Sequence, residues 1–111
     1  MAITNKVLIE SKEMEAALTT QYTVPATTKA IVDKFTATNI TASPATITIY
    51  FTPTGGTPGL DTKIIDAKTI EANSEDQLSA TVGQGLEAGG FISTEGTASA
   101  ITIRCTGREI K

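Results

Sequence analysis

The clearest pattern in the sequence is the alternation of apolar and polar residues over Ala45–Thr52. A period of two places successive side chains on opposite faces of a β-strand, so that one face is buried and the other is polar. The alternation therefore predicts a strand whose inner face carries Ile47, Ile49 and Phe51 and whose outer face carries Thr46, Thr48 and Tyr50.

Short apolar and threonine-rich runs, separated by turn-forming residues, recur along the rest of the chain. Glu10–Leu18 contains good helix formers, but a helix of that length is marginal without packing, and irregular structure or strand is favoured. The spacing predicts an all-β, antiparallel β-sandwich, jelly-roll-like, with seven to eight short strands. The other strands are expected at Ile3–Ile9, which alternatively forms an extended arm, and at Gln21–Val24, Lys29–Asn39, Thr62–Glu71, Gln77–Val82, Phe91–Glu95 and Ser99–Thr106.

The Lys29–Asn39 strand has one irregular position. Strict alternation places Ile31 and Phe35 on the same face, and Asp33 falls between them on that face. A carboxylate on an apolar face indicates a β-bulge or a position near the rim of the sheet, where it can reach water.

Composition fits one β domain over residues 1–111. The chain has 21 threonines, and threonine with valine and isoleucine suits a pleated, half-buried surface. A chain of this length buries roughly 65% of the surface it exposes when unfolded. With no tryptophan, three phenylalanines and two tyrosines, the core must be mainly aliphatic.

The net charge of -3 argues against a nucleic-acid partner, which would require a basic patch. No apolar run is long enough to cross a bilayer, and the first residues lack the features of a secretory signal. We therefore expect no membrane partner and synthesis in the cytoplasm. A single cysteine, Cys105, fits a reducing compartment.

Residues suited to catalysis are scarce. The absence of histidine removes the usual general base and the commonest metal ligand. Cys105 alternates with Ile101 and Ile103, so we expect a buried thiol. The glycines of Gly83–Gly90 match a dinucleotide-binding spacing, but the residues that follow have a strand pattern where that motif needs a helix. The sequence predicts no enzyme, no catalytic residue, no metal site and no cofactor.

No charged residue occurs over the 25 residues Thr36–Leu60. An uncharged, strand-prone surface favours edge-to-edge association unless it is central in a sheet or covered. Threonine hydroxyls alone would keep such a surface soluble, whereas a partner would bury it, and the sequence leaves both interpretations open. The stretch nominates a docking surface that includes Thr46, Thr48 and Tyr50.

One long stretch resembles a known class of proteins. TTQYTVPATTKAIVDKFTATNITASPATITIYF, followed by LEAGGFIST, resembles small β-sandwich virion proteins of tailed phages, most of all the capsid decoration (cement or staple) proteins of epsilon15-type short-tailed phages. The resemblance covers about residues 19–106. It departs from the usual pattern at Phe91, which follows Gly90 where a polar residue is common.

This resemblance implies a structural protein on the outer surface of an icosahedral head, which staples neighbouring major capsid subunits against internal DNA pressure. It implies the major capsid protein and other copies of the chain, as a dimer or trimer at a symmetry axis, as partners. Residues 1–9 and 107–111 are then candidates for extended contact arms, with Val7, Leu8 and Ile9 packing on a partner. The alternative is a carbohydrate- or receptor-binding module of a tail fibre, for which Tyr22 and Tyr50 are the candidate aromatic residues.

Overall fold

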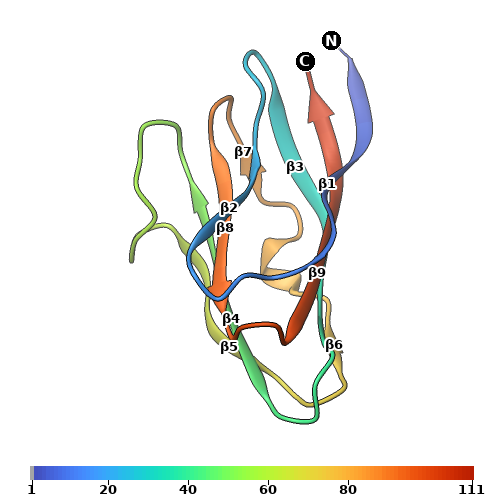
Figure 1. The fold of residues 1–111 in the computed structure, drawn as a ribbon. Helices are drawn as coiled ribbons and strands as arrows, with labels where there is room; N and C mark the ends of the chain where they lie inside the picture. The colour runs from blue at the N-terminus through green and yellow to red at the C-terminus, as the bar shows by residue number, and fades with distance from the viewer. Residues whose placement is uncertain (1) are drawn as a thin grey trace.

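Residues 2–111 of the computed structural model form two facing antiparallel sheets, with the chain crossing repeatedly from one sheet to the other (Figure 1). The β-branched runs of the sequence supply the longer strands. Within these residues the strands are β1 (Ile3–Glu13), β2 (Thr19–Thr23), β3 (Lys29–Asn39), β4 (Ala45–Thr52), β5 (Lys63–Ile70), β6 (Glu75–Asp76), β7 (Gly85–Leu86), β8 (Phe91–Gly96) and β9 (Ile101–Ile110).

The order of the strands is that of a jelly roll. One sheet runs β1-β9-β3, with the short β6 and β7 both beside β3, and the other runs β2-β8-β4-β5. Strands distant in sequence pair in nested fashion, β1 with β9, β2 with β8, β3 with β6 and β7, and β4 with β5. These nested pairs roll up into two facing Greek keys. The predicted all-β, jelly-roll-like sandwich is confirmed, and the two-residue β6 and β7 account for the larger number of strands.

An aliphatic core fills the space between the sheets. Phe35, Ile47, Ile49 and Ile103 are each 0% exposed. The inner faces predicted for β4 and β9 are confirmed, because Phe51 and the other alternating apolar residues of both strands are buried. The buried members are Ile47, Ile49, Phe51, Ile101, Ile103 and Cys105.

A β-bulge in β3 changes which residues face the core. The register with β9 shifts between Val32 and Lys34. Val32 and Phe35 are consequently both buried, while Asp33 is exposed and Ile31 is only half-buried. The bulge at Asp33 was anticipated, but the prediction that Ile31 and Phe35 share a face is wrong, because the extra residue reverses the alternation between them.

The segment predicted as a strand at Gln77–Val82 instead forms a turn and the short 3₁₀ helix η1 (Ser79–Thr81). Leu78 has φ of 41°, and its N–H donates to Asp76 Oδ1 at 2.7 Å. Thr81 Oγ1 donates to the Leu78 carbonyl at 2.8 Å. These local hydrogen bonds satisfy the backbone without a neighbouring strand, which is why the strand prediction fails here.

The two ends of the chain pair with each other in the sheet. Ala2 and Lys111 exchange backbone hydrogen bonds of 3.1 and 2.8 Å, and the termini lie side by side in Figure 1. β1 also continues to Glu13, well beyond the predicted Ile9. The described parts of 1–9 and 107–111 are thus sheet strands and do not extend from the domain as arms; Met1 lies outside the described residues.

Candidate functional site

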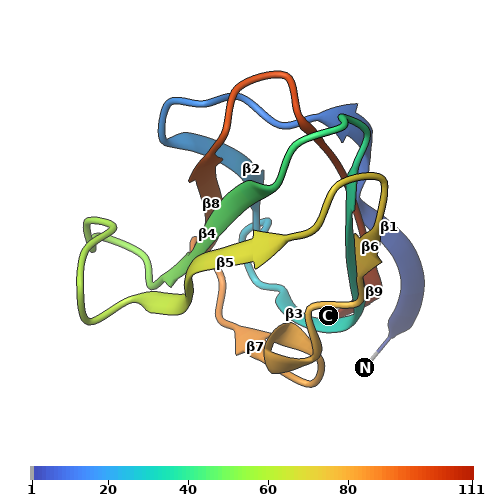
Figure 2. The ribbon, with the colours of Figure 1, turned by 90° about the horizontal axis from the view of Figure 1, so that it is seen from below.

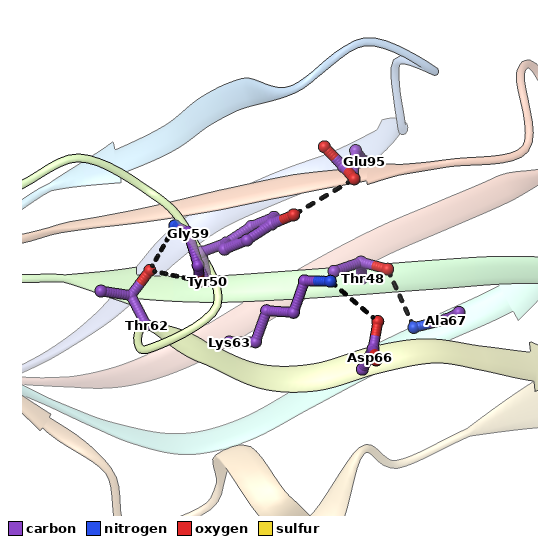
Figure 3. A network of polar contacts seen from close by, with 8 residues as sticks. All are labelled: Thr48, Tyr50, Gly59, Thr62, Lys63, Asp66, Ala67 and Glu95. Carbon is purple, nitrogen blue, oxygen red and sulfur yellow. Dashed lines mark hydrogen bonds and ion pairs between the residues drawn. The ribbon is translucent and has the colours of Figure 1, made fainter.

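The outer face of β4, nominated as a docking surface, is largely closed by the chain itself (Figure 3). Thr48 is 7% exposed and Tyr50 is 6% exposed. Thr48 Oγ1 accepts a hydrogen bond from the Ala67 N–H at 2.9 Å, and the Tyr50 hydroxyl donates to Glu95 Oε1 at 3.2 Å. The Lys63 ammonium lies 5.9 Å from the centroid of the Tyr50 ring. These contacts therefore cover the outer face of β4 at Thr48 and Tyr50.

The irregular edge strand β5 supplies this cover. Its register with β4 shifts around Ile49, and Ala67 has φ of 47°. These breaks let the Ala67 N–H reach a β4 side chain, while Lys63 and Asp66 form an ion pair of 3.1 Å on the same face. An edge strand with bulges and charges resists pairing with another chain. The uncharged β4 is thus a central strand, flanked by β5 and β8.

Two groups of this network have raised pKa values. Burial, followed by the hydrogen bond to Glu95, raises the pKa of Tyr50. The hydrogen bond to Asp66 raises the pKa of Lys63. At neutral pH the phenol therefore stays protonated and the amine stays charged. Thr46 completes the predicted strip; it is half-buried, and its N–H donates to Thr97 Oγ1 at 3.1 Å.

The predicted contact residues Val7, Leu8 and Ile9 divide into two groups. Leu8 is 7% exposed and Ile9 is 2% exposed, and both side chains pack in the core of this chain. They were expected to pack on a partner, but a register shift after Val7 lets both consecutive side chains turn into the core of this chain. Val7 alone stays half-buried.

What β1 does offer is a backbone edge. β1 pairs only with β9 among residues 2–111, so its other side has no strand neighbour. Ala2 and Lys111 exchange both backbone hydrogen bonds, so backbone groups of residues 2, 4 and 6 face β9. Those of Ile3, Asn5 and Val7 face outward, and Ile3 is 56% exposed. An open run of this kind can accept a strand of another chain.

A second exposed feature is the loop between β4 and β5, which projects from the sandwich on the side away from β1 (Figure 2). Leu60 in this loop is 89% exposed, although the loop itself is ordered by local bonds. Gly56 N–H donates to the Pro53 carbonyl at 2.9 Å, and Thr62 N–H donates to the Gly59 carbonyl at 3.1 Å. The loop thus presents one large apolar side chain on a preformed turn.

A polar contact between the sheets lies near the chain ends. The hydroxyl of Tyr22 on β2 donates to Glu109 Oε2 on β9 at 2.5 Å, and Lys6 Nζ lies 3.4 Å from the same carboxylate. Burial and this hydrogen bond raise the pKa of Tyr22. Glu109 also lines a cavity of about 180 Å³ with Thr28. Both oxygens of the Glu109 carboxylate thus have a hydrogen-bond donor, and the contact joins the two sheets.

Few reactive groups remain among the described residues. Cys105 is 0% exposed, and burial raises the pKa of its thiol to about 12, so the thiol is neutral and inaccessible. No group of three or more Asp, Glu or Cys side chains is placed to hold a metal ion within residues 2–111. In the same residues, no helix is long and apolar enough to span a bilayer.

Two features were missed at the level of sequence. Leu60 ends the uncharged stretch and directly follows Gly59 in a loop rich in proline and glycine, and an apolar residue in such a loop is the signal that would have identified it. The Tyr22–Glu109 contact joins residues 87 positions apart in sequence. No local pattern could have indicated that pair.

No protein family profile and no curated protein sequence match this chain. Among solved structures, it is similar to a chain reported under "Bacillus endospore appendages form a novel family of disulfide-linked pili", with 16% identity, a TM-score of 0.55, and coverage of 98% of this chain and 88% of that chain. It also aligns with a chain of infectious bursal disease virus Gx strain, with 11% identity, a TM-score of 0.44, and coverage of 97% and 31%. At these identities the first similarity concerns the fold alone, and the second is too weak to argue from.

Proposed function

We propose that this chain is a structural virion protein that binds the outside of an icosahedral phage capsid and staples neighbouring major capsid subunits against internal DNA pressure. Its partners are the major capsid protein and further copies of itself, at a symmetry axis of the head. The proposal starts from the resemblance of residues 19–106 to phage virion proteins and from the jelly-roll order of the strands.

The observation that carries the proposal is the presence of two separate contact features on one small domain. The open edge of β1 lies on one side of the sandwich, and the loop with Leu60 lies on the other (Figure 2). A protein that bridges two subunits needs two such surfaces, whereas a module that binds one ligand needs a single one. Burying a fully exposed leucine contributes about 1.5–3 kcal/mol, enough to matter at each copy of a repeated contact.

Other assembly and binding modes receive less support. A disulfide-linked assembly, as named for the endospore appendage protein, needs accessible thiols, and the one cysteine of these 111 residues is buried. A carbohydrate-binding module needs exposed aromatic rings to stack on sugars. Tyr22 and Tyr50 are 9% and 6% exposed, so neither offers a free face.

The loop contact is tested with heads that lack this protein. Purified chain is added to the heads, which are sedimented, and the bound copies are counted. Leu60→Ser is expected to weaken binding about tenfold or more, because it removes most of the apolar surface that the loop would bury. Leu18→Ser is the matched control, since Leu18 is also an exposed leucine, at 46%, but lies between β1 and β2.

The edge contact is tested in the same assay by Asn5→Pro, with Asn5→Ala as the control that keeps the N–H. Proline removes a backbone N–H that faces away from β9, so the pairing of β1 with β9 is retained while the free edge loses a hydrogen-bond donor for a partner strand. Occupancy is expected to fall for proline and to stay high for alanine. Full occupancy in both Leu60→Ser and Asn5→Pro would contradict the proposed role, and glycan binding without head binding would favour the tail-fibre alternative.

A further inference from the structure

A compact group of hydrogen-bond donors lies on the outer face of the β1-β9-β3 sheet. Lys34 and Thr36 on β3 are directly opposite Thr106 and Arg104 on β9. These four side chains line a shallow hollow of about 190 Å³, and no acidic residue lines it. Two cations and two hydroxyls thus converge on a small area of a rigid sheet.

The bulge in β3 places Lys34 in this group. Without it, alternation after the buried Val32 would turn Lys34 inward; with it, Asp33 and Lys34 are both exposed. Asp33 is held by Arg108, whose Nε and Nη2 lie 3.0 to 3.1 Å from its carboxylate. Lys34 has no carboxylate oxygen within 4.0 Å among residues 2–111, unlike most lysines of the chain. The carboxylate next to it in sequence is therefore unavailable to neutralise it.

Arg104 is also incompletely paired. Its Nη1 donates to Ser11 Oγ at 3.2 Å and lies 3.9 Å from Glu10 Oε1, and the Glu10 side chain is 81% exposed. Both contacts use the same nitrogen, so Nε and Nη2 have no acceptor within residues 2–111. Lys34 and Arg104 are diagonal neighbours across the β3–β9 pair, where like charges repel. An anion between them would relieve that repulsion.

We propose that Lys34, Thr36, Arg104 and Thr106 form an oxyanion-binding site whose ligand is a carboxylate side chain of a neighbouring protein subunit. Arginine presents a planar fork that matches a carboxylate, lysine adds a point charge, and the Thr106 hydroxyl donates a further hydrogen bond, whereas the Thr36 hydroxyl donates to the Arg104 carbonyl at 3.5 Å. The net charge of -3 disfavours a polyanion and favours a single carboxylate. The identity of the ligand as a subunit side chain rests on the proposed function, whereas the anion site itself does not.

The site is tested on the full chain by NMR. ¹⁵N-labelled protein is titrated with sodium acetate at constant ionic strength, with chloride as the replaced anion. Saturable amide shifts centred on residues 34–36 and 104–106 are expected. Lys34→Gln and Arg104→Gln should each weaken acetate binding about fivefold. Lys29→Gln is the matched control, because Lys29 is an exposed lysine on the same strand, but its ammonium lies 3.7 Å from Glu87.

Shifts that grow linearly and spread over all cationic residues would overturn the site, as would equal losses in Lys29→Gln and Lys34→Gln. A parallel titration with sodium phosphate separates the ligand classes, and binding of phosphate without acetate would overturn the carboxylate assignment. The outcome is distinguishable from that of the head-binding assay. If the chain binds acetate saturably but binds no head, the anion site is supported and its assignment to a subunit carboxylate is contradicted. If the chain binds heads but has no acetate site, the proposed function is supported and the anion site is contradicted.

Discussion

Gly107 lies in β9 where β1 and β3 approach it from both sides, and its replacement by alanine is expected to destabilise the fold. Its register partners are Lys6 and Val32. A Cβ at this position would lie 2.9 Å from Leu8 Cδ1 and closer still to the Ile31 carbonyl oxygen. A rotation of Leu8 relieves the first contact, but the second involves backbone and requires a strand to move.

The size of the effect follows from two opposing contributions. Forcing an extra carbon into a packed interior costs about 1–3 kcal/mol. Replacing glycine by alanine also restricts the unfolded chain, which returns about 0.4–1 kcal/mol. The expected net loss is about 1–2 kcal/mol, or a fall in Tm of about 4–10 °C for a domain of this size.

The assay is urea and thermal unfolding followed by far-UV circular dichroism. Gly85→Ala is the matched control: Gly85 also lies in a strand beside β3, but its Cβ would meet nothing closer than the Ala30 carbonyl oxygen at 3.7 Å. We expect the control to stay within about 0.5 kcal/mol of the original chain. A Gly107→Ala chain as stable as the control would refute the packing described around β9.

Three further predictions concern individual polar groups. Tyr50→Phe removes the hydrogen bond to Glu95 and is expected to cost about 0.5–1.5 kcal/mol in urea unfolding, whereas an unchanged free energy of unfolding would contradict this contribution of the bond. Burial raises the pKa of Cys105 from 9.0 to about 12, so the folded state holds the thiol proton more tightly than the unfolded state does. The resulting stabilisation of the fold is complete below pH 9 and is lost as the pH rises from 9 to 12. At pH 8 a thiol reagent should label Cys105 only as fast as the chain opens. Hydrogen bonds from Lys12 and Gln21 lower the pKa of Glu15 from its usual 4.5 to about 2. The ionised Glu15 therefore stabilises the fold above pH 4.5, and this stabilisation is lost as the pH falls towards 2. Because the Glu15 side chain is 43% exposed, the difference in acid stability between the original chain and Glu15→Gln should shrink in about 1 M salt.

The residues with strict alternation allowed the fold to be predicted. Ile47, Ile49 and Phe51 on β4 and Ile101 and Ile103 on β9 lie in the core as their spacing indicated, because a half-buried strand leaves a period of two in the sequence. The bounds of β3 and β4 were also correct. The alternation within a strand does not depend on which strands pair, so it predicts the buried residues without knowledge of the topology.

What depends on distant partners could not be predicted. Leu8 and Ile9 are consecutive apolar residues, and only their register with β9 shows that both turn inward. Tyr50 falls on the polar face of β4 by alternation, yet β5 and β8 bring Lys63 and Glu95 to cover it. Lys34 reads as an ordinary surface lysine until the bulge and the partner strand place it beside Arg104.

If the proposed function holds, a phage particle carries this chain, and electron cryomicroscopy of that particle tests the central claim most directly. The proposed function predicts jelly-roll density on the outside of the head, placed across boundaries between major capsid subunits, with the β1 edge and the Leu60 loop in contact with different subunits. Density confined to the tail, or a head whose subunit boundaries carry no such domain, would contradict it.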